Sequence, residues 1–423
     1  MIVRPRKLNF FTAVGDSFGA GIAGKGFALA LAEKVDLRLS IFSSPGFDLA
    51  TQVHSRAEVA ALRLLAAKPV ARESASFVRG APSSRRWLCP ADWPRRPGTV
   101  AADSSVRRDG RGPFIAHVFF EFERLLREEI AFLNEADVVT TASDWATHVL
   151  LDHGVRQVAT VHQGVELDIF HPLPPDSHRP PDLDGKFLVF SGGKYEYRKG
   201  TDLVIAAFAA FAERHRDAVL LINAFNPWTW TQSGLAHSPH FQFAPVAAYP
   251  SDLARVLVAN GIPADRFRVL VPGDRTELAR TMAMSDCGLF PIRCEGGTNH
   301  FLMEFMASGR PLIATHTTGL RDILRPGANC VALESLGHVA PNVATPDSER
   351  GTWQEPTVDE IVAALEFLYE HRGAGNRLAR AGLTDVYHFD WPRRATRLLE
   401  IIDAAEAGAA LPAFERSIGT APG

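Results

Sequence analysis

Residues 293–311 read Arg-Cys-Glu-Gly-Gly-Thr-Asn-His-Phe-Leu-Met-Glu-Phe-Met-Ala-Ser-Gly-Arg-Pro, and this stretch decides the fold class. It follows a short apolar run at residues 287–290, which predicts a buried strand, and it continues into a helix that the Gly-Arg-Pro sequence ends. The two glycines of the turn, Gly296 and Gly297, allow a ligand to approach closely. Thr298 can cap the helix, whose first N–H groups attract anions. The stretch therefore predicts a phosphate-binding turn between a strand and a helix.

Two carboxylates flank this turn. Glu295 stands just before it and Glu304 lies inside the helix. A carboxylate repels a phosphate, so neither glutamate should face the anion directly. We therefore expect both side chains to accept hydrogen bonds from hydroxyl groups of a sugar or a ribose. The alternatives are a buried Glu304 paired with a neighbouring cation, and a Glu295 that is merely exposed in a turn.

Apolar strands alternate with amphipathic helices along the rest of the chain, which is typical of parallel α/β sheets. A cluster of prolines from Pro172 to Pro181 separates two such units and predicts a linker. We predict strands at 9–14, 37–42, 114–118, 137–140, 157–161, 187–190, 218–224, 267–271, 287–290, 311–315 and 329–333, and helices at 25–34, 54–67, 120–133, 144–152, 201–215, 358–371 and 391–404.

The 293–311 stretch resembles the donor-binding signature of family 4 glycosyltransferases of the GT-B fold, in which two glutamates precede a helix ending in Met-Ala-x-Gly-x-Pro. The spacing between the glutamates is one residue longer here, a loop difference found in a branch of that family. The resemblance implies an α/β protein of two Rossmann-like domains whose parallel sheets face each other across a cleft. We expect an acceptor-side domain, a Pro-rich linker, a nucleotide-sugar-binding domain, a helix that crosses back to the first domain and a flexible tail, at residues 1–170, 171–185, 186–386, 387–405 and 406–423.

The resemblance also assigns roles in the second domain. Lys199 matches a lysine that meets the donor diphosphate, Lys194 stands where relatives carry an arginine, and Arg198 is a second candidate for that cation. Positive charge at the departing diphosphate is usually the largest catalytic term. We therefore expect Glu295, Lys199 and Lys194 to be catalytic. The further donor-binding residues are Glu304, Arg198, Gly296, Gly297, Thr298, Asn299, Gly193 and Pro272, the last from the loop that holds the nucleotide base in relatives.

The first domain contributes a histidine and a glycine pattern. His117 lies near the end of the strand predicted at 114–118, where relatives often carry a histidine near the transferred sugar, and we expect it to be catalytic; a surface or hydrogen-bonded histidine is the alternative. Gly19, Gly21 and Gly24 form a Gly-x-Gly-x-x-Gly pattern, but it does not start at a strand end and lacks the acidic partner of a dinucleotide site. We expect Gly19 and Gly21 to approach the diphosphate or the acceptor, with a tight turn as the alternative.

The composition of the chain limits the kinds of molecule and the compartment that we expect for it. A net charge of −3 predicts no general affinity for nucleic acid, and four scattered cysteines suit a reducing compartment. No apolar run approaches the roughly 20 residues of a spanning helix, so we expect a cytoplasmic protein, with peripheral contact at the inner face of the membrane as an alternative. Residues 72–111 hold nine arginines against four acidic residues. Arg85, Arg86, Arg95 and Arg96 form either a solvated loop or a contact to an anionic acceptor or membrane.

Together these features predict a retaining glycosyltransferase that transfers a hexose from a UDP- or GDP-sugar to a hydroxyl of a glycan, a lipid-linked saccharide or a small molecule. We expect no cofactor and no metal, since His237 and His240 lack companions at metal-ligand spacing. Two alternatives stay open. One is a GT-B protein that binds a nucleotide or glycan without catalysis, and the other is an oxidoreductase. The donor base, the acceptor, the oligomeric state and the role of residues 44–112 do not follow from the sequence.

Overall fold

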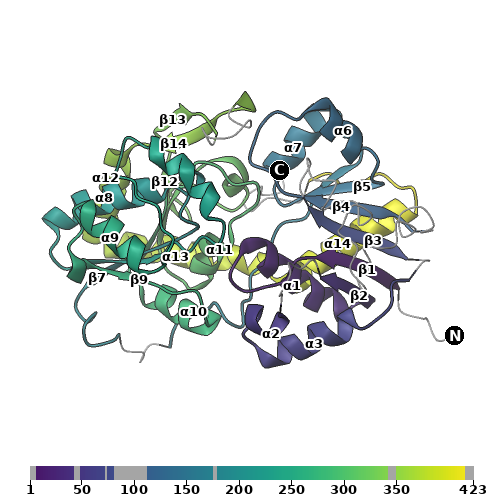
Figure 1. Ribbon diagram of the computed structural model, residues 1–423, viewed down its shortest axis with the longest axis horizontal. Coiled ribbons are helices and arrows are strands. Elements are labelled where there is room, and N and C mark those ends of the chain that lie inside the picture. Colours follow the sequence, from purple (N-terminus) through teal and green to yellow (C-terminus); the bar gives the residue numbers. More distant parts are fainter. Residues whose placement is uncertain are drawn as a thin grey trace. The chain divides into compact units, whose positions relative to one another are not determined.

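The computed structural model describes residues 6–41, 48–71, 74–80, 112–174, 179–341 and 349–414. The chain divides into two compact units (Figure 1). The first contains Met1–Glu166, Gly296–Thr298 and Phe389–Ser417; the second contains Leu167–Glu295, Asn299–His388 and Ile418–Gly423. Arg85, Arg86, Arg95 and Arg96 lie outside the described residues, so the anion-contact hypothesis for them stays a prediction.

The first unit is built on a six-stranded parallel sheet with the strand order β2-β1-β3-β4-β5-β6. Its strands are β1 (Lys7–Thr12), β2 (Asp36–Ile41), β3 (Ala75–Gly80), β4 (Phe114–Val118), β5 (Val138–Thr141) and β6 (Val158–Thr160). Its helices are α1 (Gly19–Ala32), α2 (Leu49–Gln52), α3 (Arg56–Ala66), α6 (Arg127–Leu133), α7 (Asp144–Asp152) and α14 (Trp391–Glu406).

Aromatic packing joins this sheet to α1 and α14. The Phe10 and Phe77 ring centroids lie 4.8 Å apart on the neighbouring strands β1 and β3. Phe27 of α1 packs edge-on against Trp391 of α14, with centroids 5.2 Å apart. These side chains belong to one buried apolar cluster, so α14 is part of the core of the first unit.

The second unit also has a six-stranded parallel sheet, with the order β12-β11-β10-β7-β8-β9. Its strands are β7 (Phe187–Gly192), β8 (Ala218–Asn223), β9 (Phe267–Val269), β10 (Cys287–Phe290), β11 (Leu312–Thr315) and β12 (Val331–Leu333), beside an antiparallel hairpin of β13 (Leu336–Val339) and β14 (Trp353–Pro356). Its α-helices are α8 (Thr201–Arg214), α9 (Ser251–Ala259), α10 (Arg275–Met284), α11 (His300–Ala307), α12 (Val358–Glu370) and α13 (Arg372–Val386). The 3-10 helices are η3 (Tyr197–Lys199), η4 (Thr229–His237), η5 (Ala264–Arg266), η6 (Thr318–Asp322) and η8 (Tyr387–Phe389).

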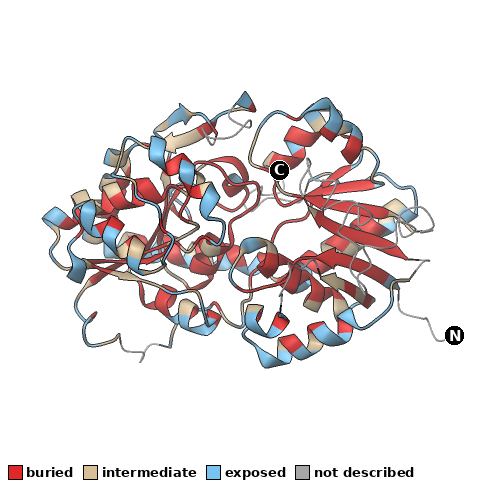
Figure 2. Ribbon diagram, viewed as in Figure 1, coloured by how far each residue is buried: buried red, intermediate tan, exposed pale blue. Residues whose placement is uncertain are grey.

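The predicted α/β class with two parallel sheets is confirmed. The strands of both sheets are largely buried, and exposed residues gather on the outer helices (Figure 2). The helix predicted at 120–133 is wrong at its start, because the Leu126 N–H donates to the Glu129 carboxylate at 2.9 Å and the helix begins at Arg127. Strand β3, helix α13 and the β13–β14 hairpin were not predicted.

Helices that span a membrane need a long, weakly charged apolar stretch. Within the described ranges, every helix is too short or too polar for this.

Candidate functional site

The loop after β7 carries the lysine-rich segment of the second unit. Strand β7 ends at Gly192, η3 holds Arg198 and Lys199, and Gly200 leads into α8. Gly200 has a φ of +69°, and a Cβ atom there would lie 2.1 Å from the carbonyl oxygen of Pro291. A glycine is therefore required at this position, which directly follows Arg198 and Lys199.

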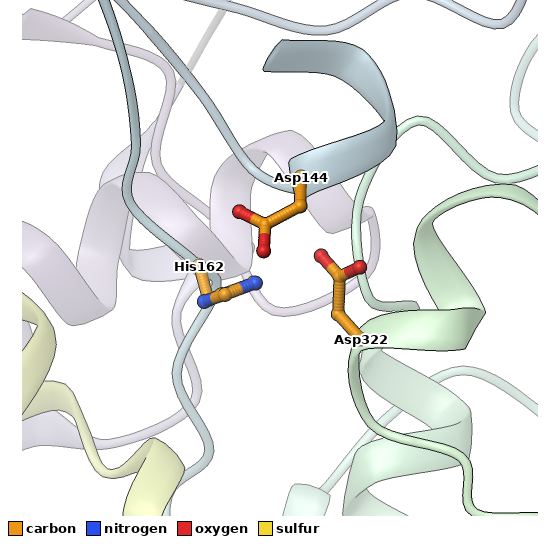
Figure 3. A group of neighbouring side chains, drawn as sticks. All are labelled: Asp144, His162 and Asp322. Atoms are coloured by element: carbon orange, nitrogen blue, oxygen red, sulfur yellow. The ribbon is translucent and has the colours of Figure 1, made fainter. Parts of the chain in front are cut away.

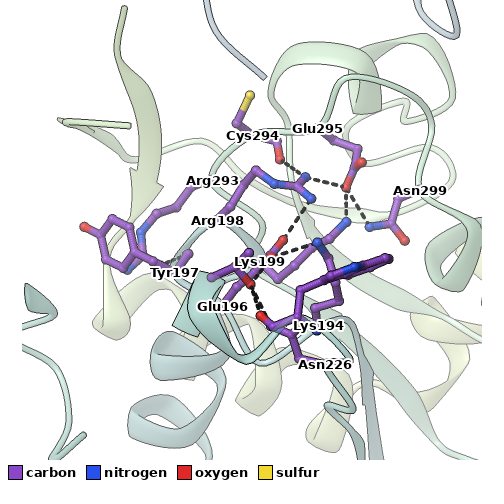
Figure 4. Close-up of polar contacts among 12 residues, drawn as sticks. Lys194, Glu196, Tyr197, Arg198, Lys199, Asn226, Arg293, Cys294, Glu295 and Asn299 are labelled. Atoms are coloured by element: carbon purple, nitrogen blue, oxygen red, sulfur yellow. Dashed lines mark hydrogen bonds and ion pairs between the residues drawn. The ribbon is translucent and has the colours of Figure 1, made fainter. Parts of the chain in front are cut away.

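Three cations of this loop share two carboxylates, an arrangement we call the cation cluster: Lys194, Arg198 and Lys199 with Glu196 and Glu295 (Figure 4). Glu196 lies 2.8 Å from the Lys194 ammonium and 2.9 Å from the Arg198 guanidinium. Glu295 pairs with Lys199 and lies 3.4 Å from Arg198. The cluster thus has one more positive than negative side chain.

Burial strengthens the electrostatic interactions of Glu295 and Lys199. The side chains of Glu295 and Lys199 are 11% and 12% exposed. Burial alone would raise the pKa of Glu295, but Lys199 and Arg198 outweigh it and lower that pKa to about 2. Burial also lowers the pKa of Lys199 against the opposing pull of Glu295. Glu295 is therefore ionised at neutral pH, and an anionic ligand would compensate the remaining positive charge of the cluster.

Asn299 links the cluster to helix α11. Its side-chain amide donates to Glu295 at 3.0 Å, and its carbonyl oxygen accepts from the Leu302 N–H at 3.1 Å. Asn299 therefore caps the helix, and the expectation that Thr298 is the cap is wrong. The predicted helix end is confirmed, since Gly309 follows Ser308 with a φ of +69°.

Glu304 faces a cation within the second unit. Its carboxylate lies 2.7 Å from the guanidinium of Arg275, and the side chains are 2% and 5% exposed. The Arg275 guanidinium also lies over the Phe170 ring, 4.9 Å from its centroid. The alternative of a cation-paired Glu304 is thus what the structure shows, and its contact with a ribose stays a prediction.

Two further predicted donor residues lie in loops of the second unit. Gly193 directly follows β7, and its Cβ position would be 3.4 Å from the Lys199 Cβ. Pro272 lies half-buried in the loop between β9 and α10, next to the exposed Val271. Gly193 therefore adjoins the cation cluster, and the role of Pro272 towards a nucleotide base stays a prediction.

The turn at 296–298 is grouped with the first unit. There the Ser143 hydroxyl donates to the Gly296 carbonyl at 3.0 Å, and the Thr298 N–H donates to the Gln163 side chain at 3.1 Å. Gly297 lies between these two residues. That Gly296, Gly297 and Thr298 bind an anion stays a prediction.

His117 on β4 is fully buried in the first unit. Its Nδ1 lies 3.0 Å from the Thr140 hydroxyl, while its Nε2 is buried without a hydrogen-bond partner. Burial, and then the neighbouring Arg79, lower the pKa of His117 well below its usual range, so the imidazole is neutral. The surface-histidine alternative is therefore wrong, and the hydrogen-bonded alternative holds for Nδ1.

Helix α1 contains the glycine pattern. It begins at Gly19 and includes Gly21 and Gly24. A Cβ atom at Gly24 would lie 1.9 Å from the Ala13 carbonyl oxygen, so this glycine is required by close packing of the helix on the chain after β1. The contact of Gly19 and Gly21 with a ligand stays a prediction.

Two groups of side chains resemble metal ligands. In the first unit, Asp144 and His162 present ligand atoms within 4.8 Å of each other (Figure 3), and the Asp144 carboxylate accepts from the Thr160 hydroxyl at 2.6 Å. Asp322, also drawn there, belongs to the second unit.

The second group lies around His240. The fold brings Asp202 and Glu355 beside it, companions that sequence spacing did not indicate. The fully buried Arg293 donates to Asp202 at 2.8 Å and to Glu355 at 2.6 Å. Since a guanidinium already neutralises these carboxylates, we assign this group to an ion-pair network.

Three polar residues of these sites escaped prediction. Glu196 lies between Lys194 and Lys199 in the sequence, and an acidic residue among these cations could have indicated an ion pair. Arg275, the partner of Glu304, and Arg79 lack such a signal, because only the fold shows that they are buried.

Residues 185–345 match the family model described as Glycosyl transferases group 1. This matched region contains the cation cluster, Glu304 and Arg275. The predicted resemblance to family 4 glycosyltransferases is confirmed, and the family supports an enzyme.

Curated relatives of the chain are named as glycosyltransferases. The chain is 25% identical over 288 residues to D-inositol 3-phosphate glycosyltransferase 1 of Catenulispora acidiphila, covering 66% of this chain and 60% of that protein. It is 27% identical over 308 residues to the D-inositol 3-phosphate glycosyltransferase of Mycobacterium tuberculosis H37Ra, covering 71% and 54%. The matched region thus spans little more than half the length of these relatives.

Solved structures share the fold. The Anabaena protein HepE in complex with UDP superposes with a TM-score of 0.61 and 14% identity, covering 94% of this chain and 100% of that one. An α,α-trehalose-phosphate synthase (UDP-forming) from Burkholderia vietnamiensis gives a TM-score of 0.64 and 15% identity, covering 96% and 100%. At these identities the similarity shows the fold alone, and it confirms the GT-B class.

Proposed function

We propose that the protein is a retaining hexosyltransferase that uses a nucleoside-diphosphate sugar and transfers the hexose to a hydroxyl group of an acceptor. The observation that carries this proposal is the cation cluster, in which three buried or half-buried cations share two carboxylates. Cations held in place before the reaction stabilise charge that develops on a departing diphosphate. The group 1 glycosyl transferase match over the same residues supports this use.

Each residue of the cluster has a proposed role. Lys199, Arg198 and Lys194 stabilise the diphosphate, and Glu295 accepts hydrogen bonds from hydroxyls of the sugar. Glu295 is ionised, because its pKa is about 2, so it can act as an acceptor at any physiological pH. Glu304 is proposed to hold the ribose hydroxyls beside Arg275.

Other predicted residues complete the proposal. The backbone of Gly296, Gly297, Thr298 and Asn299 contributes N–H groups to the diphosphate, with Gly193 beside Lys199. Pro272 contributes to the base site. His117 lies near the transferred sugar, and Gly19 and Gly21 approach the diphosphate or the acceptor.

The reaction needs no protein nucleophile. The acceptor hydroxyl oxygen forms a bond to the anomeric carbon on the face from which the diphosphate leaves, and the bond from that carbon to the β-phosphate oxygen breaks. The hydroxyl proton passes to a phosphate oxygen, so that the products are a glycoside and a nucleoside diphosphate. We propose that neither a cofactor nor a metal takes part, and chelation with EDTA is therefore expected to leave the rate unchanged.

The first donors to test are UDP-hexoses, because HepE is described in complex with UDP and with UDP-glucose. GDP-hexoses are the second class. The first acceptors to test are small polyols and sugars, since the curated relatives are named for D-inositol 3-phosphate. Glycans and lipid-linked saccharides follow.

The test is release of nucleoside diphosphate from a panel of UDP-, GDP- and ADP-hexoses in the presence of acceptors, with the anomeric configuration of the product read by NMR. The proposal expects release with one donor and retention of the donor's configuration. An inverted product would refute the retaining mechanism. Thermal stabilisation by a donor without any release would favour the alternative of a GT-B binding protein that does not catalyse.

A further inference from the structure

Two residues of the second unit have a backbone conformation that residues other than glycine rarely adopt. Asn299 has a φ of +60° and Thr318 a φ of +41°, and within the described ranges they are the only non-glycine residues with positive φ. Asparagine tolerates this conformation, whereas it is strained for a β-branched residue such as threonine. Strained backbone persists only where the surrounding structure enforces it, and such residues gather at functional sites.

Both of these residues contact Glu295. The Asn299 side-chain amide donates to the Glu295 carboxylate at 3.0 Å (Figure 4). The Thr318 hydroxyl accepts from the Glu295 N–H at 2.9 Å, and the Gly319 N–H donates to the Glu295 carbonyl oxygen at 3.1 Å. We call Asn299, Thr318 and Gly319 the Glu295 clamp. It holds both polar groups of the Glu295 backbone as well as the side chain.

The sheet of the second unit explains why these loops meet. β10 and β11 are parallel neighbours, so their carboxyl ends lie at the same edge of the sheet. Glu295 lies in the loop after β10, which ends at Phe290, and Thr318 lies in the loop after β11, which ends at Thr315. Open α/β sheets bind their ligands at this edge. The strained loop after β11 therefore supports the loop after β10 where a ligand is expected.

The Glu295 side chain is also held in one orientation. Lys199, Arg198 and Asn299 each direct a donor to the same carboxylate oxygen, Oε2, and the distances from Arg198 and Asn299 are 3.4 Å and 3.0 Å. A group that must meet a substrate is effective only when its neighbours hold it in place. The backbone and the side chain of Glu295 are thus fixed by two separate sets of contacts.

The choice of threonine at position 318 needs an explanation, because a glycine would adopt the same φ without strain. What threonine adds is the hydroxyl that accepts from the Glu295 N–H. We propose that Thr318 is a positioning residue, whose hydroxyl holds the loop after β10 so that the Glu295 carboxylate meets the hydroxyls of the donor sugar. The effect on sugar transfer rests on the proposed function, whereas the Glu295 clamp itself does not.

The first measurement is independent of activity. Hydrogen exchange of the Glu295 amide is followed by NMR in the wild type, Thr318→Val and Thr318→Ser. Loss of one hydrogen bond should speed this exchange by about fivefold to tenfold in Thr318→Val, and Thr318→Ser, which keeps the hydroxyl, should exchange as the wild type does. Equal exchange in the wild type and Thr318→Val would overturn the clamp, whether or not the protein transfers sugar.

The second measurement is nucleoside diphosphate release at saturating donor. Thr318→Val should lower kcat by about tenfold or more, since a misplaced group loses much of its effect, and Thr318→Ser should retain most of the activity. The Kd of the free nucleoside diphosphate, UDP for a UDP-hexose or GDP for a GDP-hexose, should stay unchanged, because it carries no sugar for Glu295 to bind. A general disturbance of the second unit would weaken this binding as well.

Thr281→Val is the matched control. It removes another buried threonine hydroxyl of the second unit, which lies in α10 and donates to the Glu277 carbonyl oxygen at 2.9 Å. This variant should match the wild type in the exchange of the Glu295 amide and in kcat. If it lowers kcat as much as Thr318→Val does, the effect is not specific to Thr318 and the positioning role is refuted.

Thr318→Gly separates positioning from stability. Glycine removes the hydroxyl but also the strain, so this variant should unfold at a higher urea concentration than Thr318→Val and yet lose as much kcat. It also keeps the test decisive if the valine variant does not fold. A wild-type kcat in Thr318→Gly would overturn the positioning role. If the Glu295 amide responds as expected but the wild type turns over no donor, the proposed transfer fails and the clamp remains.

Discussion

Replacing Lys199 by alanine tests the cation cluster most directly. The Lys199 ammonium pairs with Glu295 in a setting where both side chains are nearly nine-tenths buried. Removing one preorganised group that stabilises charge in a transition state typically lowers kcat by a factor of about 100 to 1,000. Arg198 remains 3.4 Å from Glu295 and can partly replace the lost charge, so we expect the lower end, about 100-fold.

The same change also affects stability. Breaking a buried ion pair by removing one partner costs about 3 to 5 kcal/mol, because the other charge stays buried. Asn299 and Arg198 still contact Glu295, so we expect a loss in the free energy of unfolding near 3 kcal/mol. A urea titration monitored by circular dichroism measures this loss, and kinetics must be recorded at a temperature where the variant is folded.

The assay is nucleoside diphosphate release at saturating donor, with Lys186→Ala as the control. Lys186 precedes β7 in the same unit and forms no ion pair through its side chain with any described residue, so its replacement should leave kcat unchanged. A folded Lys199→Ala protein with less than a tenfold decrease in kcat would remove Lys199 from the proposed site. An equal decrease in the control would show that the effect is not specific.

The other predictions concern the scaffold around the site. The pKa of Glu295 is about 2, against an ordinary 4.5, so its ionised form stabilises the fold by about 3 kcal/mol at pH values above 4.5. This stabilisation is lost as the pH falls towards 2. Glu295→Gln should therefore flatten the acid side of a plot of unfolding free energy against pH, and Glu213→Gln, at an exposed position, should not. Gly200→Ala should lower the unfolding free energy by more than about 2 kcal/mol in a urea titration, since both its φ and the space around it exclude a Cβ atom. Arg275→Ala and Glu304→Ala should each cost about 3 to 5 kcal/mol, and a double-mutant cycle should show a combined loss well below the sum.

Periodic patterns located most of the elements of this fold. The strand at residues 287–290 and the helix at 144–152 have the predicted bounds, because apolar periodicity and a Ser143 cap define them locally. Strand β3 was not predicted because its sequence does not alternate regularly between apolar and polar residues. Ser76 and Arg79 are buried polar residues, and a strand that buries polar side chains lacks the alternation on which prediction depends.

The candidate site divides in the same way. A local motif indicated Lys199, Lys194 and Glu295 together with the helix that follows, and the structure places these three side chains in one cluster. The partners of these charges come from distant parts of the chain. Arg275 lies 29 residues before Glu304, and nothing in its neighbourhood along the sequence indicates that the two side chains meet.

Charge balance separates the buried ionic groups of this protein into two kinds. Lys25 has three carboxylates around it and Arg293 has two, so each of these cations is neutralised within the fold and needs no ligand. The cation cluster differs, because its three cations face only two carboxylates. Since a buried excess charge is costly unless something compensates it, an anion is expected at this cluster. The cluster lies within the second unit, where the donor diphosphate is proposed to bind.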